Sequence, residues 1–230
     1  MDVKTLKPLH GWRAFFGEVG VVVLGVLLAL GAQQVVQEFQ IRSDLREFRT
    51  TIDREIGMDV YGFDLRASQF GCDRQRLAEL TKWLDQSRNG PTALAIYPRP
   101  PVVISPSRSA WNSRDAETYR QLPADIRQKY AMFYDDVDNA WEINKRELET
   151  WNSLRIFSEP GPLSLEDRRK ARSTITGLDQ AIRVEEENIP YTKELAEELG
   201  VKAVVPQDLS PAFIKEARLC RSVLVPNPKS

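Results

Sequence analysis

An uninterrupted apolar run near the N-terminus constrains the fold of this chain more than any other feature. Between Ala14 and Val36 the only ionisable side chain is that of Glu18. A helix rises about 1.5 Å per residue, so roughly 20 residues cross the hydrocarbon layer of a membrane. Both faces of the stretch 19–30 are apolar, whereas a soluble helix buries one face only. The run therefore predicts a transmembrane helix over residues 14–36.

The residues that flank the run favour one orientation. Lys4, Lys7 and Arg13 precede it, and positive charge accumulates on the cytoplasmic side of a membrane. Arginines also follow the run between residues 42 and 54, so the difference in charge is small. We expect residues 1–13 to form a cytoplasmic tail, and the segment after the run to lie outside the cytoplasm.

A cleaved signal peptide is the alternative interpretation of the run. Ala29-Leu30-Gly31 places small residues at a spacing that suits cleavage. Two features argue against cleavage: Glu18 lies early in the run, and the residues after it continue a helical pattern without a break. Glu18 itself has two interpretations, as a functional carboxylate within the membrane or as a group at the headgroup interface. Its place near the start of the run favours the interface.

After the run, apolar residues recur every three or four positions over three long stretches, which is typical of amphipathic helices. The first stretch follows residues 41–84, with a bend expected near one of its glycines. The second follows Pro123 and stops before Glu159. The third begins at Ser164, which a capping pattern marks as a helix start, and ends at Gly200. We expect an all-α fold in which these three helices form an antiparallel bundle in up-down-up order.

The segments between and after these helices carry many prolines. Residues 89–106 contain five of them, which excludes a regular helix and predicts a proline-rich loop packed over the surface. Short helices are expected at 109–119 and from Ser210-Pro211 onwards, and a short strand at 201–205 paired with part of the loop. The water-exposed domain should cover residues 37–222, followed by a flexible tail at 223–230.

The chain contains two cysteines, Cys72 and Cys220. In a reducing compartment they would be small buried hydrophobic residues. Outside the cytoplasm, an even number of cysteines in one domain indicates a disulfide. Under the expected topology, the sequence therefore predicts a Cys72–Cys220 bridge that ties the C-terminal segment to the first long helix.

Composition and motifs argue against most catalytic chemistry. The 32 Lys and Arg nearly balance the 33 Asp and Glu, which gives no reason to expect a nucleic-acid partner. His10 is the only histidine and precedes the apolar run, so the domain lacks the commonest general base and metal ligand. No phosphate-binding glycine motif occurs. We expect no enzyme activity, cofactor or metal; Glu185-Glu186-Glu187 is interpreted as a solvated acidic face.

One loop-to-helix junction could contact a ligand or a partner. The segment 105–111 brings hydroxyls together with Arg108, Ser109 and Trp111. Helix N-terminal amides and an arginine can hold an anionic or peptide ligand. The competing interpretation, which we favour, is a helix cap whose Trp111 fills the bundle.

The apolar run, Gly17-Glu18 followed by VVVLGVLLAL, resembles a group of bacterial single-pass membrane proteins of unassigned activity. In that group a G-E-x-x-x-V-x-x-G-V-x-x-A-L helix precedes a helical domain. The segment 109–111, Tyr119 with Leu122-Pro123, and the late Cys220 are further shared features. The likeness extends over most of the chain and is firmest in the run. It implies a bacterial inner-membrane protein with a periplasmic domain, and it implies no activity.

These features together predict a membrane-anchored helical domain that binds a protein or an envelope component. The partner would be another protein or a second copy of the chain, in addition to the lipid bilayer. A ligand-sensing module that acts through a partner protein is the alternative. An enzyme that uses two converging carboxylates is a third, less favoured hypothesis.

Overall fold

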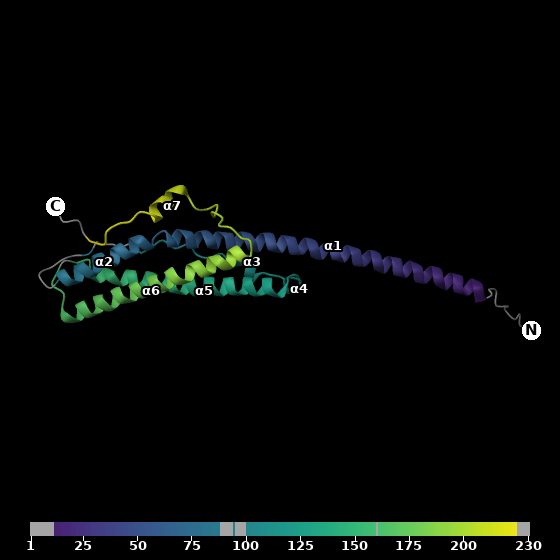
Figure 1. The fold of residues 1–230 in the computed structure, drawn as a ribbon, viewed down its shortest axis with the longest axis horizontal. Helices are drawn as coiled ribbons and strands as arrows, with labels where there is room; N and C mark the ends of the chain where they lie inside the picture. The colour runs from purple at the N-terminus through teal and green to yellow at the C-terminus, as the bar shows by residue number, and fades with distance from the viewer. Residues whose placement is uncertain (1–11, 88–93, 95–99, 160, 225–230) are drawn as a thin grey trace, which may run out of the picture. The chain divides into compact units, whose positions relative to one another are not determined.

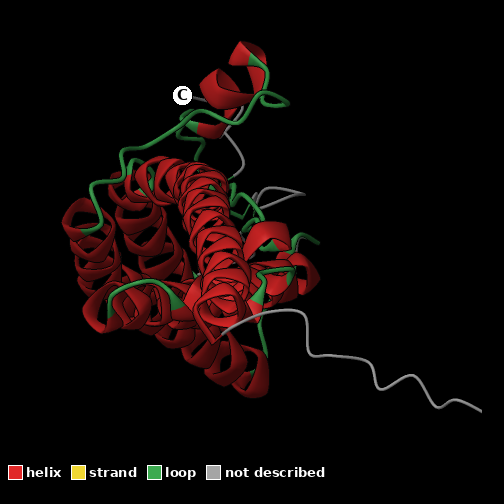
Figure 2. Cartoon of the chain, turned by 90° about the vertical axis from the view of Figure 1, so that its right-hand side faces the viewer, coloured by secondary structure: helices red, strands yellow, loops and turns green. Residues whose placement is uncertain are grey.

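The computed structural model of the chain describes residues 12–87, 94, 100–159 and 161–224. Within those residues every regular element is a helix and no strand occurs, as Figure 2 shows. This confirms the predicted all-α class. The chain divides into two compact units, Met1–Arg49 and Thr50–Ser230.

The first unit consists, where it is described, of the N-terminal part of helix α1 (Trp12–Ala67). All side chains from Phe15 to Asp44 are exposed. An 18-residue window of this helix reaches a mean hydropathy of 2.2, and none of the window is buried. The helix is therefore long and apolar enough to cross a membrane.

The second unit contains the rest of α1 and the remaining helices, of which α2 to α7 are labelled in Figure 1. These are α2 (Phe70–Gln86), α3 (Ser109–Asn112), α4 (Ala116–Arg120), α5 (Ala124–Ser153), the 3-10 helix η1 (Leu154–Phe157), α6 (Leu165–Glu198) and α7 (Pro211–Ala217).

The boundary between α1 and α2 is the bend expected in the first long stretch. It lies at Ser68 and Gln69, two residues before Gly71. The Gln69 amide fixes the proline-rich segment to this point, because its Nε2 donates to the Val102 carbonyl and its Oε1 accepts from the Val102 amide, both at 2.8 Å. Residues 100–107 are described as a loop that packs over the bundle, as the sequence predicted.

The directions of the long helices differ from the expected up-down-up arrangement. Tyr130 and Tyr134 at the start of α5 donate to Asp53 and Glu55 of α1, whereas Glu147 further along α5 contacts Arg66 further along α1. The two helices therefore run in the same direction. Of the long helices in the described residues, α6 runs opposite to both. The physical reason is that the chain returns along α1 before α5 begins: Val102 contacts Gln69, and Trp111 contacts Glu55 nearer the start of α1.

The ends of α6 are those that the sequence predicted. Ser164 accepts a hydrogen bond from the Asp167 amide, and the Asp167 carboxylate accepts one from the Ser164 amide, which completes a capping box. At the other end Gly200 has φ +78°, a left-handed conformation that glycine adopts at low cost.

The C-terminal segment corrects two expectations. Residues 201–205 form no strand; instead the Val204 amide donates to the Gly57 carbonyl of α1 at 2.8 Å. Val223 is 1% exposed and Leu224 forms an isolated antiparallel bridge with Leu94, so these two residues are held in place and do not belong to a flexible tail. The rest of the predicted tail, 225–230, lies outside the described residues.

A hydrophobic core joins α2, α5, α6 and the C-terminal segment at one end of the bundle. Trp83 and Trp151 are both 0% exposed and belong to this cluster together with Leu178. Burying large aromatic side chains supplies most of the hydrophobic stabilisation in a core of this size. This packing holds the neighbouring helices, and the polar side chains that they carry, in fixed positions.

Candidate functional site

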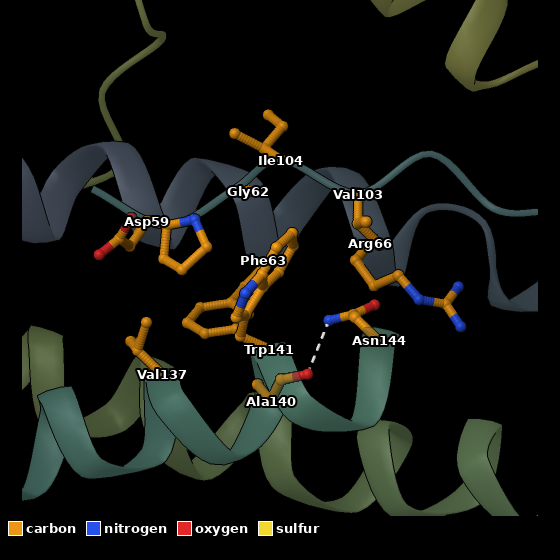
Figure 3. A pocket seen from close by; sticks show the side chains of 11 residues that line it. Asp59, Gly62, Phe63, Arg66, Val103, Ile104, Val137, Ala140, Trp141 and Asn144 are labelled. Carbon is orange, nitrogen blue, oxygen red and sulfur yellow. Dashed lines mark hydrogen bonds between the residues drawn. The ribbon is translucent and has the colours of Figure 1, made fainter. Parts of the chain in front are cut away.

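A small cavity lies in the second unit where α1, the segment 103–106 and α5 meet (Figure 3). Its volume is about 30 Å³. Its polar lining residues are Asp59 and Arg66 of α1 and Asn144 of α5. The remaining lining residues are Gly62, Phe63, Val103, Ile104, Pro106, Val137, Ala140 and Trp141.

Asp59 presents a buried carboxylate to this cavity. Its Oδ1 accepts a hydrogen bond from the Ser107 amide at 2.9 Å, while its Oδ2 has no partner among the described residues. Burial raises the pKa of Asp59 from 3.8 to about 7; the Ser107 hydrogen bond opposes this rise, and the nearby Glu55 carboxylate adds to it. Asp59 therefore exchanges its proton near neutral pH.

Asn144 supplies the second polar group. Its Nδ2 donates to the Ala140 carbonyl at 2.9 Å, drawn as a dashed line in Figure 3, and its Oδ1 has no partner among the described residues. The bond to Ala140 determines which end of the amide is free, because only a nitrogen can donate to a carbonyl. Asp59 and Asn144 thus both offer acceptor oxygens.

A second buried polar cluster adjoins the cavity and is centred on the Arg66 guanidinium. Its Nη1 donates to Asp73 Oδ2 at 2.6 Å, its Nη2 to Glu147 Oε2 at 2.9 Å, and its Nε to Glu185 Oε2 at 2.8 Å. Arg66 and its three carboxylate partners are each at most 2% exposed. One helix turn on, Arg76 lies 3.8 Å from the other oxygen of Asp73.

Three carboxylates contact the one Arg66 guanidinium, and Arg76 lies near Asp73 alone, so an excess of negative charge stays buried around Glu147 and Glu185. Burial raises the pKa of Glu185 from 4.5 to about 8; Arg66 opposes the rise, and the neighbouring Glu147 carboxylate adds to it. Burial also raises the pKa values of Asp73 and Glu147. The rise favours the protonated form of Glu185 at neutral pH.

The predicted contact segment around Ser109 is held by Glu55 of α1. The Glu55 carboxylate accepts from the amides of Ala110 and Trp111 at 2.8 and 3.1 Å and from the Ser109 hydroxyl at 3.3 Å. The Tyr134 hydroxyl donates to the same carboxylate at 2.6 Å. The chain's own carboxylate thus occupies the N-terminal amides of α3, which is the capping arrangement that the sequence favoured.

Arg108 and Trp111 contact α5. Arg108 donates to Asp138 Oδ2 at 2.5 Å and to the Tyr134 carbonyl at 2.6 Å. The Trp111 ring stacks on the Tyr134 ring with 4.5 Å between centroids, and Arg114 lies 3.8 Å over the Trp111 centroid. Arg108 and Trp111, which the sequence predicted as possible contacts for a ligand or partner, therefore hold α3 against α5 of the same chain.

The remaining predicted residues lie apart from the cavity. Cys72 and Cys220 form the predicted disulfide, with 5.3 Å between their Cα atoms and a separation of 148 positions in sequence. Glu18 lies in the first unit and is exposed. The described residues contain no group of three or more His, Cys, Asp or Glu that could hold a metal ion.

Sequence reasoning missed the polar residues that matter most here. Glu185 was assigned to a solvated face, which is wrong, since it is 1% exposed. Its position between Ile182 and Ile189 on the apolar stripe is a signal that could have revealed its burial. Arg66 and Asn144 occupy the same kind of position on α1 and α5.

Comparison with known proteins adds nothing to this geometry. No protein-family model matches the chain, and neither a curated protein nor a solved structure matches it.

Proposed function

We propose that the chain is a single-pass membrane protein whose helical bundle binds a protein or an envelope component outside the cytoplasm. In this proposal residues 14–36 span a bacterial inner membrane, the N-terminus is cytoplasmic and the bundle lies in the periplasm. The bundle is a tethered binding or scaffolding domain and not an enzyme. The assignment to a bacterial inner membrane rests on the resemblance of the apolar run to bacterial single-pass proteins.

The Cys72–Cys220 disulfide is the observation that carries this proposal. Disulfides persist in oxidising compartments and are rare in the cytosol. The bond lies within the second unit, and the same chain carries an exposed apolar helix long enough to cross a membrane. A bundle on the oxidising side of that membrane satisfies both features.

Exposed apolar side chains support a partner for the bundle. The C-terminal segment carries several of them, and exposed apolar side chains on one segment can form a surface for a partner. Their exposed fractions are 39% for Val204, 52% for Val205, 39% for Phe213 and 47% for Leu219. The disulfide at Cys220 fixes this segment to the bundle, so that these side chains are held in place for binding.

Photo-crosslinking in intact cells tests the binding role. A benzophenone amino acid at Phe213 of the full chain should give a discrete crosslinked product, whether to another protein or to a second copy. The same probe at Glu187, an exposed polar position on α6, is the matched control and should give none. Absence of a product at 213, or turnover of an envelope substrate by the purified protein, would contradict the proposal.

A ligand-sensing module is a second candidate, and the cavity beside Asp59 favours it. Such a module would transmit the state of its cavity to a partner in the membrane. Co-purification of a transmembrane kinase or receptor whose activity changes with Asp59→Asn would distinguish sensing from scaffolding.

A further inference from the structure

Three arginines lie on one face of the first two turns of α6. Arg168, Arg169 and Arg172 follow Leu165 at intervals of three, four and seven residues, a spacing that places side chains on the same side of a helix. We call these four residues the basic stripe. Leu165, Arg169 and Arg172 are exposed, and Arg168 is half-buried. The stripe therefore gathers three guanidinium groups and one large apolar side chain on a single surface.

The three arginines of the basic stripe form no ion pair within the part of the chain that the structure describes. Further along the same face, the Asp179 carboxylate is engaged by Arg74 at 2.5 Å and by Arg183 at 2.9 Å. Glu166 follows Leu165 directly and so projects about 100° away around the helix. Asp167 accepts from the Ser164 amide in the capping box. Positive charge on the stripe is thus left without a facing carboxylate.

Two large aliphatic side chains are exposed where α5 leads into α6. Leu165 is 58% exposed, and Ile156 of η1 is 54% exposed. Their neighbours Leu154, Phe157 and Ala171 are buried in the hydrophobic core, so packing fixes the backbone that carries them. The α5–α6 corner, formed by η1 and the first two turns of α6, therefore presents cationic and aliphatic side chains together on a fixed surface.

We propose that the α5–α6 corner binds the anionic surface of a phospholipid bilayer through the basic stripe. The guanidinium groups contact lipid phosphates, and Leu165 and Ile156 enter the layer beneath the headgroups. This assignment deepens the binding role proposed above and rests on it, because an anionic lipid surface is one class of envelope component.

The chemistry of the corner favours lipid over an acidic protein. A guanidinium presents paired N–H donors that match the oxygens of a phosphate, and it keeps its charge at physiological pH. In interfacial binding, cations meet the headgroups while neighbouring apolar side chains reach the acyl boundary. A bilayer offers both layers at once. An acidic protein would satisfy the arginines but would need an apolar patch placed to match Leu165 and Ile156.

The position of the corner within the second unit leaves it far from the entry of α1. Thr50, the first residue of this unit, lies near the start of α5, since Tyr130 donates to Asp53. The corner follows the other end of α5, about 45 Å away for a helix of 30 residues. In Figure 1 the turn between α5 and α6 lies at the end of the bundle opposite α4.

Cosedimentation with vesicles tests the proposal on the full chain held in phosphatidylcholine nanodiscs, which keep the apolar helix in a neutral bilayer. Vesicles that contain phosphatidylglycerol are compared with vesicles of phosphatidylcholine alone, and empty nanodiscs are the blank. Three surface cations should make binding to the anionic vesicles about 100-fold tighter at low salt. About 1 M salt, where the Debye length is about 3 Å, should abolish this preference. Equal sedimentation with both kinds of vesicle at low salt would overturn the proposal.

Paired arginine substitutions locate the contact. Arg169→Ser/Arg172→Ser removes two exposed charges of the stripe and should weaken binding to anionic vesicles at least about tenfold. Arg54→Ser/Arg146→Ser removes the same charge from exposed positions on α1 and α5 and should leave the binding unchanged. Thermal unfolding checks that both variants fold. Equal losses in the two variants, or no loss in the first, would refute the stripe as the contact.

Leu165→Ser distinguishes a lipid surface from an acidic protein. It should weaken binding to anionic vesicles about tenfold, because the leucine no longer enters the bilayer. Binding of fluorescent poly-glutamate to the same nanodiscs should be unaffected. Vesicle binding that Leu165→Ser leaves intact, with poly-glutamate bound more tightly than the vesicles, would assign the stripe to an acidic protein and overturn the lipid assignment. The crosslink expected at Phe213 tests a different segment, so failure here leaves that binding role standing.

Discussion

At the scale of single residues, this bundle is unusual for the charge that it buries. Arg66 can serve three carboxylates because a guanidinium carries five N–H donors in one plane. A buried ion pair gains little net stability, but removing one partner leaves an uncompensated charge at a cost of about 3–5 kcal/mol. With three acids around one guanidinium, the excess charge is relieved when Glu185 keeps its proton.

Protonation of Glu185 makes the stability of the bundle depend on pH. Its pKa is about 8 in the folded chain and near 4.5 in the unfolded chain, so the folded state binds the extra proton between these values. The free energy of unfolding should therefore fall as pH rises from about 4.5 to 8 and should level off above that range. Asp59 contributes a fall of the same sign that ends near pH 7, and the raised pKa values of Asp73 and Glu147 add to the fall.

Glu185→Gln should flatten the dependence between pH 7 and 8 and should be more stable than the wild type above pH 8. Gln keeps the shape and one donor without the charge. Urea unfolding followed by the fluorescence of the buried Trp83 and Trp151 measures the effect. Glu187→Gln, at an exposed position on the same helix, is the control. A slope between pH 7 and 8 that is equal in Glu185→Gln and the control would contradict the assignment of the proton.

The sequence predicts local features of single residues and misses their distant partners. The capping box at Ser164 and the stop at Gly200 depend on neighbours three to five residues away, and both are confirmed. The Arg66 cluster joins residues separated by up to 119 positions, which no local pattern encodes. The Cys72–Cys220 pair was predictable because two cysteines allow a single pairing.

At the scale of elements, α1 shows how close packing fixes the chain around it. The C-terminal segment crosses α1 at Gly57, where the absence of a side chain lets the Val204 amide reach the Gly57 carbonyl at 2.8 Å. Five residues later Gly62 faces the cavity, and its nearest neighbour would be in ordinary contact with an added methyl group. The two glycines lie in the same helix but meet different surroundings.

Alanine substitutions at the two glycines should therefore have opposite effects. A Cβ at position 57 would lie 2.7 Å from the Lys202 carbonyl oxygen and 2.8 Å from Val204 Cγ2, so Gly57→Ala should destabilise the bundle by about 1–3 kcal/mol. Gly62→Ala should stabilise it by roughly 0.5–1 kcal/mol through helix propensity. Thermal unfolding of the two variants measures the difference. Similar shifts in both would contradict the close approach at Gly57.

The positions of the helices along the chain were predictable from the sequence, whereas their relative directions in the bundle were not. Spacing of apolar residues fixes which face of each helix is buried, and it located α5 and α6 closely. The parallel run of α1 and α5 depends on the return path of the proline-rich connection. That path is fixed by contacts such as Gln69 with Val102, which periodicity does not encode.

At the scale of the whole chain, the disulfide joins distant parts of the second unit. It closes a loop of 148 residues, and the chain-entropy relation for a loop of this length gives about 5 kcal/mol as the upper range of its stabilisation. Around it, Val223 and Ser222 bond to Glu79 of α2, so the bond reinforces contacts that the C-terminal segment already makes.

Cys220→Ser should lower the free energy of unfolding by about 2–5 kcal/mol. The reason is that the C-terminal segment loses its covalent tie to α2 and the unfolded chain gains freedom. Urea unfolding with and without reductant measures this. Reductant should lower the wild type to the level of the variant and leave Cys72→Ser/Cys220→Ser unchanged. A wild type that is indifferent to reductant would show that the bond does not stabilise the bundle.

The central claim is that an apolar helix anchors a disulfide-bonded bundle on the oxidising side of a membrane. A membrane-impermeant maleimide, applied to intact cells with a permeabilised outer membrane, tests it most directly at Cys72 and Cys220. We predict labelling of both cysteines only after addition of reductant, without opening the inner membrane. Free thiols that react without reductant, and only once the inner membrane is opened, would contradict the claim.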